Sequence, residues 1–178
     1  MRGLRSRERG FTLIEALYAM VIALVLLGSM YSVYSSHYNS FKVQEQVAEA
    51  QQNARAALQL MSRDIIMAGY STATGIIFAN ITSLTIKSAA TQTSYSRYSS
   101  ARIGRSSGGT RQAVAESVKG ISFKYRDGAG NLLTPDGSGN VAVGIVRQIL
   151  VSVTTGTPVF GSYSASCTLE TTLSPRNL

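Results

Sequence analysis

The chain has 178 residues, enough for one ordinary domain or for a smaller domain attached to an extended element. Hydrophobic residues make up 44% of it and charged residues only 15%, which is high for a soluble protein and indicates that the apolar residues are unevenly placed. The formal net charge of +8 is a weak argument for nucleic-acid binding, because part of that charge lies in a short N-terminal tail.

Residues 1–10 form a basic leader in front of an apolar segment. Four arginines stand against one glutamate there, so the leader carries +3 of the net charge. Residues 11–34 form a 24-residue stretch in which Glu15 is the only charged side chain. At about 1.5 Å per residue, a helix of this length crosses a bilayer core of about 30 Å. The basic leader predicts that the N-terminus stays in the cytoplasm and that the C-terminal bulk is exported.

An ordinary secretory signal peptide is another explanation of this N-terminal segment. The apolar part of a signal peptide spans about 7–15 residues and ends at a small-residue cleavage site. Here the apolar stretch is longer, and no convincing A-x-A site follows it. We therefore predict a membrane anchor at residues 11–34.

The apolar stretch continues into a segment that predicts one long helix, from residue 11 to about residue 68. No proline interrupts it, and Gly69 suits the left-handed conformation that ends many helices. In residues 35–69, apolar side chains recur at intervals of three and four, which predicts an amphipathic helix with one face on a partner surface. This apolar stripe comprises Val43, Val47, Ala50, Ala54, Leu58, Met61, Ile65 and Ala68.

Residues 70–178 predict a β-rich globular domain. Short runs of β-forming residues, some alternating between apolar and polar, predict four strands. The candidates are residues 81–87, 120–126, 145–153 and 167–172, and the third has Ile145, Ile149, Val151 and Val153 on one face. A sheet with one apolar face needs cover, which the amphipathic helix can supply. The predicted fold class is α+β, a long N-terminal transmembrane and amphipathic helix packed on a small antiparallel β-sheet.

Two segments between the candidate strands predict loops. Residues 88–110 are rich in Ser, Thr, Tyr, Gly and Arg, and we interpret them as a long exposed loop. Residues 127–140 contain two D-G-x-G-N sequences, which begin at Asp127 and Asp136. Oxygen-rich segments of this kind can bind calcium, but no EF-hand spacing or closing glutamate is present. Because Asp-Gly and Gly-Asn are strong turn signals, we expect two turns and no cofactor.

The most informative residues run from Gly10 to Glu15 and read G-F-T-L-I-E, between the basic leader and the apolar stretch. At all six positions the chain resembles the precursor signature of the type IV pilin and type II secretion pseudopilin superfamily. The resemblance implies cleavage after Gly10 by a membrane-embedded prepilin peptidase and methylation of the new Phe11 amine. It also implies assembly into a filament whose core is a bundle of N-terminal helices.

Glu15 needs an explanation, because ionisable groups inside a membrane are costly and usually paired. Cleavage creates an amine at Phe11 with a reference pKa of about 7.7–8.0. The resemblance implies that Glu15 pairs with such an amine on a neighbouring subunit. A buried pair of this kind specifies axial register more than it adds stability, because desolvation offsets much of the attraction. Alternatively, the carboxylate only favours the positive end of the helix dipole and stays at the membrane interface.

Two shorter segments point to a branch of the superfamily. Residues 63–70, Arg-Asp-Ile-Ile-Met-Ala-Gly-Tyr, resemble the helix end of PilW-like minor pilins and J-type minor pseudopilins. The ending at residues 175–178, Pro-Arg-Asn-Leu, is similar to the basic-Asn ending common there. Both favour a minor subunit over a major one. A solvated charge pair at Arg63 and Asp64, with an ordinary cap at Gly69, is the simpler explanation of the first segment.

The remaining polar residues give weaker signals. Residues 95–111 suit a DNA-binding surface through Arg97, Arg102, Arg105, Arg111, Tyr95 and Tyr98, although we favour a solvated loop and expect no nucleic-acid binding. His37 has no evident metal or catalytic partner. Cys167 is the only cysteine, so it forms no internal disulfide, and its strand pattern predicts a small buried hydrophobe. No catalytic constellation is visible, and we expect no enzyme.

The sequence thus predicts a cleaved leader at residues 1–10, a long helix at 11–69 and a globular domain at 70–178. We expect a minor type IV pilin with Gly10, Phe11 and Glu15 as its site residues. Its partners would be other pilin or pseudopilin subunits, a prepilin peptidase and the inner-membrane assembly platform. It would pass from the bacterial inner membrane, with its C-terminal domain exported, into a filament. The alternatives are a type II secretion minor pseudopilin and a membrane-anchored binding module, for DNA for example, that never polymerises.

Overall fold

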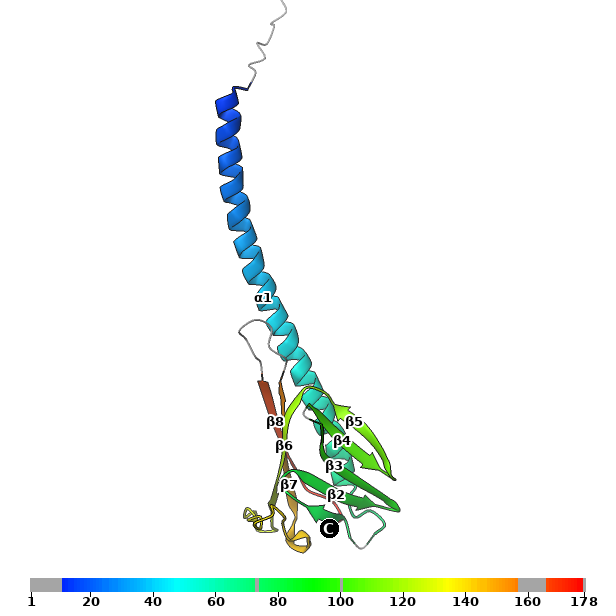
Figure 1. Cartoon of the computed structure of the whole chain (residues 1–178). Helices are drawn as coiled ribbons and strands as arrows, with labels where there is room; N and C mark the ends of the chain where they lie inside the picture. Colours follow the sequence, from blue (N-terminus) through cyan, green and yellow to red (C-terminus); the bar gives the residue numbers. More distant parts are fainter. Residues whose placement is uncertain (1–10, 73, 100, 157–165, 178) are drawn as a thin grey trace, which may run out of the picture. The chain divides into compact units, whose positions relative to one another are not determined.

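The structure is a computed structural model that describes residues 11–72, 74–99, 101–156 and 166–177. The chain divides into two compact units, Met1–Lys42 and Val43–Leu178. The predicted domain boundaries after residues 10 and 69 rest on cleavage and composition, and they stay predictions. Helix α1, Leu13–Ile66, contributes to both units, and Figure 1 colours the chain from its N-terminus to its C-terminus.

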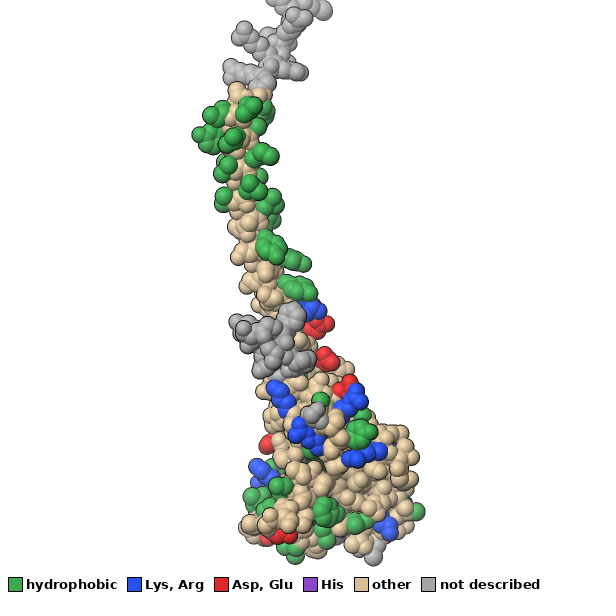
Figure 2. Space-filling view, in the orientation of Figure 1, with side chains coloured by type: hydrophobic (Ala, Val, Ile, Leu, Met, Phe, Trp, Pro, Cys, Tyr) green, Lys and Arg blue, Asp and Glu red, His purple; other side chains and the backbone are tan. Residues whose placement is uncertain are grey.

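The first unit contains the apolar half of α1. The side chains of residues 11–34 are all exposed in the structure, although most of them are apolar. This helix is long and apolar enough to cross a membrane, and Figure 2 shows its hydrophobic side chains uncovered. Exposure of so much contiguous apolar surface to water is unfavourable, so this half of the helix requires lipid or protein around it.

The second unit contains the amphipathic half of α1, and its apolar face is the one that the sequence predicts. Six of the eight stripe residues are buried, and Val43 and Val47 are half-buried. The buried members of the face are Ala50, Ala54, Ala57, Leu58, Met61, Ile65 and Ala68. The helix ends at Ile66, two residues earlier than predicted, and Gly69 has the expected left-handed conformation with φ of 82°.

Two antiparallel sheets complete the second unit, and they confirm the α+β fold class. One sheet has the strand order β1-β2-β3-β4-β5 and the other β6-β7-β8. The strands are β1 Ile76–Ala79, β2 Ser83–Ser88, β3 Thr91–Ser99, β4 Arg102–Ser107, β5 Thr110–Ala115, β6 Val118–Arg126, β7 Gln148–Gly156 and β8 Ser166–Leu173. A short 3-10 helix, η1 Val143–Ile145, precedes β7.

The predicted loop at residues 88–110 is wrong, because most of this segment is sheet. Strands β3, β4 and the start of β5 occupy it. Gly108 and Gly109 both have positive φ, which suits the hairpin turn between β4 and β5. Serine, threonine and tyrosine pair well on a half-buried sheet. Among the described residues of this segment, only Thr93, Tyr95, Ile103 and the small Gly104 are buried.

The other strand predictions are confirmed with shifted ends. Strand β6 contains the predicted residues 120–126 and buries alternate side chains, and β8 contains residues 167–172. Strand β2 begins at Ser83, because Ile81 instead exchanges main-chain hydrogen bonds with Gly139 and Phe123. Strand β7 begins at Gln148, and Ile145 lies in η1 with its side chain 52% exposed, so its predicted place on the buried face is wrong.

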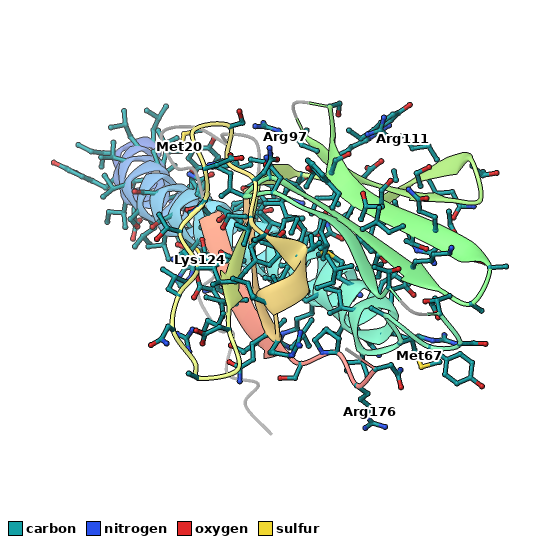
Figure 3. All side chains as sticks on the ribbon, turned by 90° about the horizontal axis from the view of Figure 1, so that it is seen from below. Met20, Met67, Arg97, Arg111, Lys124 and Arg176 are labelled. Carbon is teal, nitrogen blue, oxygen red and sulfur yellow. The ribbon has the colours of Figure 1, made fainter. Side chains whose placement is uncertain are left out.

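One hydrophobic core joins α1 to both sheets within the second unit. Met61 and Ile65 of α1, Tyr95 of the first sheet, and Phe123 and Tyr125 of the second are among its largest fully buried side chains. Figure 3 shows side chains filling the space between these elements. A buried polar contact crosses the same interface, because Oγ1 of Thr155 in β7 donates to the main-chain oxygen of Ala50 at 2.8 Å. The C-terminal half of α1 and the two sheets therefore share one buried core.

Candidate functional site

The described part of the N-terminal motif starts at Phe11, since Gly10 and the leader lie outside the described residues. The main-chain N–H groups of Glu15 and Ala16 donate to the oxygen of Thr12 at 3.1 and 3.2 Å. Thr12 is therefore the residue that caps α1. The predicted cleavage would leave Phe11 as a short, exposed extension just before the helix.

Glu15 lies in the first turn of α1 and contacts Thr12. Oγ1 of Thr12 donates to Oε2 of Glu15 at 3.4 Å and accepts the N–H of Glu15 at 3.4 Å. The T-x-x-E spacing is that of a capping box, and a carboxylate here also favours the positive end of the helix dipole. The carboxylate stays exposed. A capping role within the chain is thus compatible with a partner for Glu15 from another molecule.

Aromatic side chains follow the apolar stretch of α1. Tyr31, Tyr34, Tyr38 and Phe41 are all exposed, and the rings of Tyr34 and Tyr38 stack with centroids 6.3 Å apart. Their spacing of three and four residues places them on one helix face. Tyrosine is enriched where a transmembrane helix leaves the hydrocarbon, because its ring is apolar and its hydroxyl is polar. This band therefore suits the membrane boundary.

The two short segments that point to a branch of the superfamily lie together in the structure. The N–H of Arg176 donates to the main-chain oxygen of Ile66 at 3.3 Å, and the oxygen of Asn177 lies against Gly69. The N–H of Gly69 in turn donates to the oxygen of Lys87 at 2.9 Å. The end of α1, the C-terminal tail and strand β2 therefore form one structural unit, which the sequence presents as separate segments.

Asp64 has a partner that the sequence does not reveal. It does not form the solvated pair with Arg63 that the simpler explanation of this segment implies. Its Oδ2 instead accepts the Tyr95 hydroxyl at 2.6 Å and the Nε–H of Arg105 at 2.7 Å. The side chains of Asp64 and Arg105 are only 17% and 24% exposed. Burial, and then the bond to Asp64, raises the pKa of the Tyr95 phenol, and the same carboxylate raises the pKa of Arg105.

The proposed DNA surface is also reorganised by the sheet. Tyr95 is fully buried, so its ring is unavailable for stacking on bases. Arg111 lies over the Tyr98 ring at 4.7 Å and donates to Ser96 at 2.9 Å. The exposed Arg102 pairs with Glu116 at 2.8 Å. These basic side chains are held by neighbours in the sheet instead of projecting from a loop.

The two D-G-x-G-N sequences form the same turn, as the sequence predicts. The Asp127 carboxylate accepts N–H groups of Ala129 and Asn131 at 2.9 and 2.8 Å. Asp136 accepts the equivalent groups of Ser138 and Asn140 at the same two distances. Hydrogen bonds hold the pKa of each aspartate below its usual range. The largest effect on Asp127 comes from the side chain of Asn131, and the largest effect on Asp136 comes from the main-chain N–H of Asn140. Each carboxylate thus has a structural role.

Two further sequence expectations concern His37 and Cys167. Cys167 lies in β8, as predicted, but is half-buried instead of buried. His37 is exposed among the aromatic residues of the band. Across the described ranges, no three His, Cys, Asp or Glu side chains are placed to share a metal ion. The expectations of no cofactor and no catalysis stay predictions.

Comparison with known families identifies a prokaryotic N-terminal methylation motif at residues 5–31. This motif is the prepilin signal of type IV pilin-like proteins, and it supports a pilin-like or pseudopilin-like protein processed by a prepilin peptidase. The match covers the leader and the first part of α1 and leaves the β-rich region unmatched. No curated protein matches the chain. Motif and apolar helix together support membrane anchoring.

Proposed function

We propose that this chain is a minor type IV pilin. The observation that carries the proposal is the methylation motif at residues 5–31, which ends in the exposed apolar half of α1. On this proposal a prepilin peptidase cuts between Gly10 and Phe11, and the Phe11 amine is methylated. The chain is first anchored in the bacterial inner membrane with its C-terminal domain exported. It is then assembled into a filament, in which α1 packs against the helices of other subunits. Its role is structural and not catalytic.

The end of α1 supports a minor subunit over a major one. The segment at residues 63–70 and the ending at 175–178 each resemble PilW-type minor pilins and J-type pseudopilins. Arg176 and Asn177 of the ending contact the first segment in the structure. A J-type minor pseudopilin of type II secretion is the second candidate, because the same two segments favour it. Copurification distinguishes them, since a pilin would bring down pilus subunits and a pseudopilin would bring down secretion-channel components.

A membrane-anchored binding module that never polymerises is the candidate from another class. It requires a ligand surface and no processing. The structure gives DNA binding less support than the sequence does, since Tyr95 is buried and Arg102 is paired with Glu116. The processing experiment below tests this alternative directly.

Intact-mass analysis of the full chain from cells with and without a prepilin peptidase tests the proposal. We expect the peptidase to remove residues 1–10 and the product to carry one additional methyl group. Gly10→Leu should block cleavage, because a side chain before the cut prevents close approach of the protease to the backbone. Gly28→Leu is the matched control, since nothing lies within 4 Å of a Cβ there. Retention of the leader in both strains would exclude a pilin or pseudopilin.

A further inference from the structure

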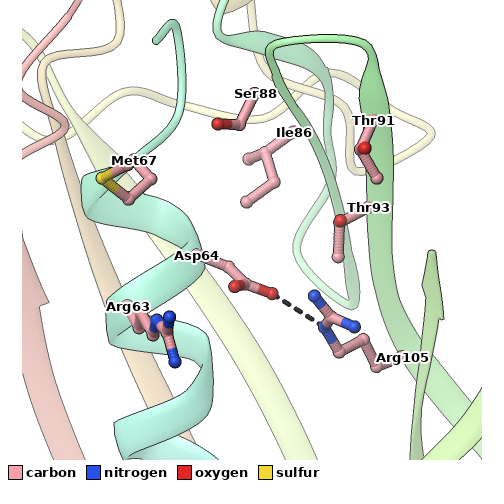
Figure 4. A pocket seen from close by; sticks show the side chains of 8 residues that line it. All are labelled: Arg63, Asp64, Met67, Ile86, Ser88, Thr91, Thr93 and Arg105. Atoms are coloured by element: carbon pink, nitrogen blue, oxygen red, sulfur yellow. Dashed lines mark hydrogen bonds and ion pairs between the residues drawn. The ribbon is translucent and has the colours of Figure 1, made fainter.

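A polar cleft lies between the end of α1 and the five-stranded sheet, inside the second unit. Its volume is about 300 Å³, and Figure 4 shows the side chains around it. It is lined by Arg63, Asp64 and Met67 of α1, Ile86 and Ser88 of β2, Thr91 and Thr93 of β3, and Arg105 of β4. The space is large enough for one side chain of a bound protein segment.

Two hydrogen bonds from Nε orient the Arg105 side chain in this cleft. Nε donates to Oδ2 of Asp64 at 2.7 Å and to the Tyr95 hydroxyl at 3.2 Å. Tyr95 lies directly opposite Arg105 in the β3–β4 register, so the strand pairing fixes both side chains. Among the described residues, Nη1 and Nη2 of Arg105 donate no hydrogen bond. An arginine held through Nε presents its two terminal amino groups as a fork, which matches a carboxylate.

The rest of the lining suits an anionic group on a short apolar stem. Arg63 and Arg105 outnumber the single acidic residue, Asp64, so the cleft has a net charge of +1. Within the described part of the chain, the side chain of Arg63 forms no hydrogen bond or ion pair. The hydroxyls of β2 and β3 add donors, and the side chains of Met67 and Ile86 give apolar walls. The net positive charge of the cleft therefore suits an anionic group, and its apolar walls suit the stem of a side chain.

We propose that this cleft binds a glutamate or aspartate side chain of a partner protein, with the carboxylate on the Nη groups of Arg105 and on Arg63. A nucleic-acid backbone is a poorer occupant, because it needs a continuous basic track and exposed rings. Here Arg102 is paired with Glu116, Arg111 is held by Tyr98 and Ser96, and Tyr95 is buried. The proposal does not depend on leader cleavage or polymerisation.

The test uses the full chain in lipid nanodiscs with methyl-labelled methionine and isoleucine, followed by NMR. The probes are the capped peptide acetyl-Gly-Glu-Gly-amide, the same peptide with glutamine, inorganic phosphate and single-stranded oligothymidine. We expect the glutamate peptide to shift the Met67 and Ile86 methyl signals and the glutamine peptide to leave them unchanged. Equal shifts with both peptides, or no shift with either, would overturn the proposal. Stronger shifts with phosphate or oligothymidine than with the glutamate peptide would overturn the assignment to a protein carboxylate.

Arg63→Gln is the decisive variant, because Arg63 is exposed and is not part of the core. It should weaken binding of the glutamate peptide about tenfold, as expected for loss of one charge-assisted hydrogen bond. Arg55→Gln is the matched control on the exposed surface of α1, outside the cleft, and should leave the affinity unchanged. Equal affinities of the two variants would place the peptide elsewhere. Arg105→Lys keeps the positive charge and removes the forked pair of amino groups. Its thermal unfolding is measured alongside binding, because the substitution also removes the Nε–H that the Asp64 carboxylate accepts.

Discussion

The main-chain oxygen of Asn177 occupies the space that a side chain on Gly69 would need. Gly69 ends the long helix in the left-handed region, and Asn177 is the last described residue of the chain. The close approach holds the C-terminal tail on the end of α1, where the N–H of Arg176 reaches the oxygen of Ile66. A glycine at position 69 is therefore required by conformation and by space at once.

Gly69→Ala should destabilise the globular part by about 1–3 kcal/mol. An alanine at φ of 82° is strained, and its Cβ collides with Asn177, so the tail must move and lose its bond to Ile66. Urea unfolding of the full chain in detergent, followed by the near-ultraviolet signal of the tyrosines, measures the change. Gly137→Ala is the matched control, because its φ is ordinary and nothing lies within 4 Å of a Cβ. Equal stability of the two variants would contradict the contact with the tail.

The folded chain should lose stability as the pH rises above about 10. Burial raises the pKa of the Tyr125 phenol, whose hydroxyl donates to the oxygen of Asn80 at 2.8 Å, and burial with the bond to Asp64 raises that of Tyr95. Both phenols ionise in the unfolded chain near pH 10 and stay neutral in the folded chain. The contribution of these two phenols to the free energy of unfolding is therefore fully present below pH 10. It is lost as the pH rises toward their raised pKa values in the folded chain.

Alkaline titration of tyrosine absorbance tests this pH dependence. Of the nine tyrosines, Tyr95 and Tyr125 should ionise only as the protein unfolds. Tyr125→Phe should reduce the loss of stability at high pH, whereas Tyr98→Phe should not, since Tyr98 is exposed. Ionisation of all tyrosines near pH 10 in a still folded protein would disprove the burial of these two phenols.

The helix and the fold class were predictable because their signals are local. A long apolar run, the absence of proline and a stripe at intervals of three and four fix α1 and its buried face without any knowledge of the partner. Alternation of Ile121, Phe123 and Tyr125 fixes β6 in the same way. The last turn of α1 was placed two residues too far, because the tail and β2 take over the hydrogen bonds of the helix end.

The five-stranded sheet and the Asp64 cluster were not predictable in the same way. Residues 88–110 carry few large apolar side chains, so composition suggests a loop, although a structureless loop of that length inside a compact domain was itself an argument against it. Once β3 and β4 pair, Tyr95 lies opposite Arg105 and both reach Asp64, which is 31 residues before Tyr95. Only the register brings these side chains together, and no local pattern encodes that register.

A tryptophan at position 34 should report the membrane boundary. At about 1.5 Å per residue, Tyr34 lies about 32 Å from Leu13, close to the thickness of the hydrocarbon core, whereas Leu24 lies near its centre. The chain has no tryptophan, so Tyr34→Trp and Leu24→Trp each introduce one fluorophore. Lipids brominated near the headgroup should quench position 34 more strongly, and lipids brominated near the chain end should quench position 24. The same quenching profile at both positions would show that the helix does not span the bilayer.

Substitution of Glu15 separates its two proposed roles. Glutamine keeps an oxygen that can contact Thr12 in the first turn of α1, since capping boxes accept either residue, but it cannot form an ion pair with the Phe11 amine of a neighbour. Valine removes both interactions. If the charge is needed for register between subunits, Glu15→Gln and Glu15→Val should both be inserted and cleaved, and both should be depleted at least tenfold from sheared filaments. Restoration of wild-type incorporation by glutamine would assign Glu15 to the helix cap alone. Glu49→Gln, a loss of the same charge on an exposed position further along α1, is the matched control and should be incorporated normally.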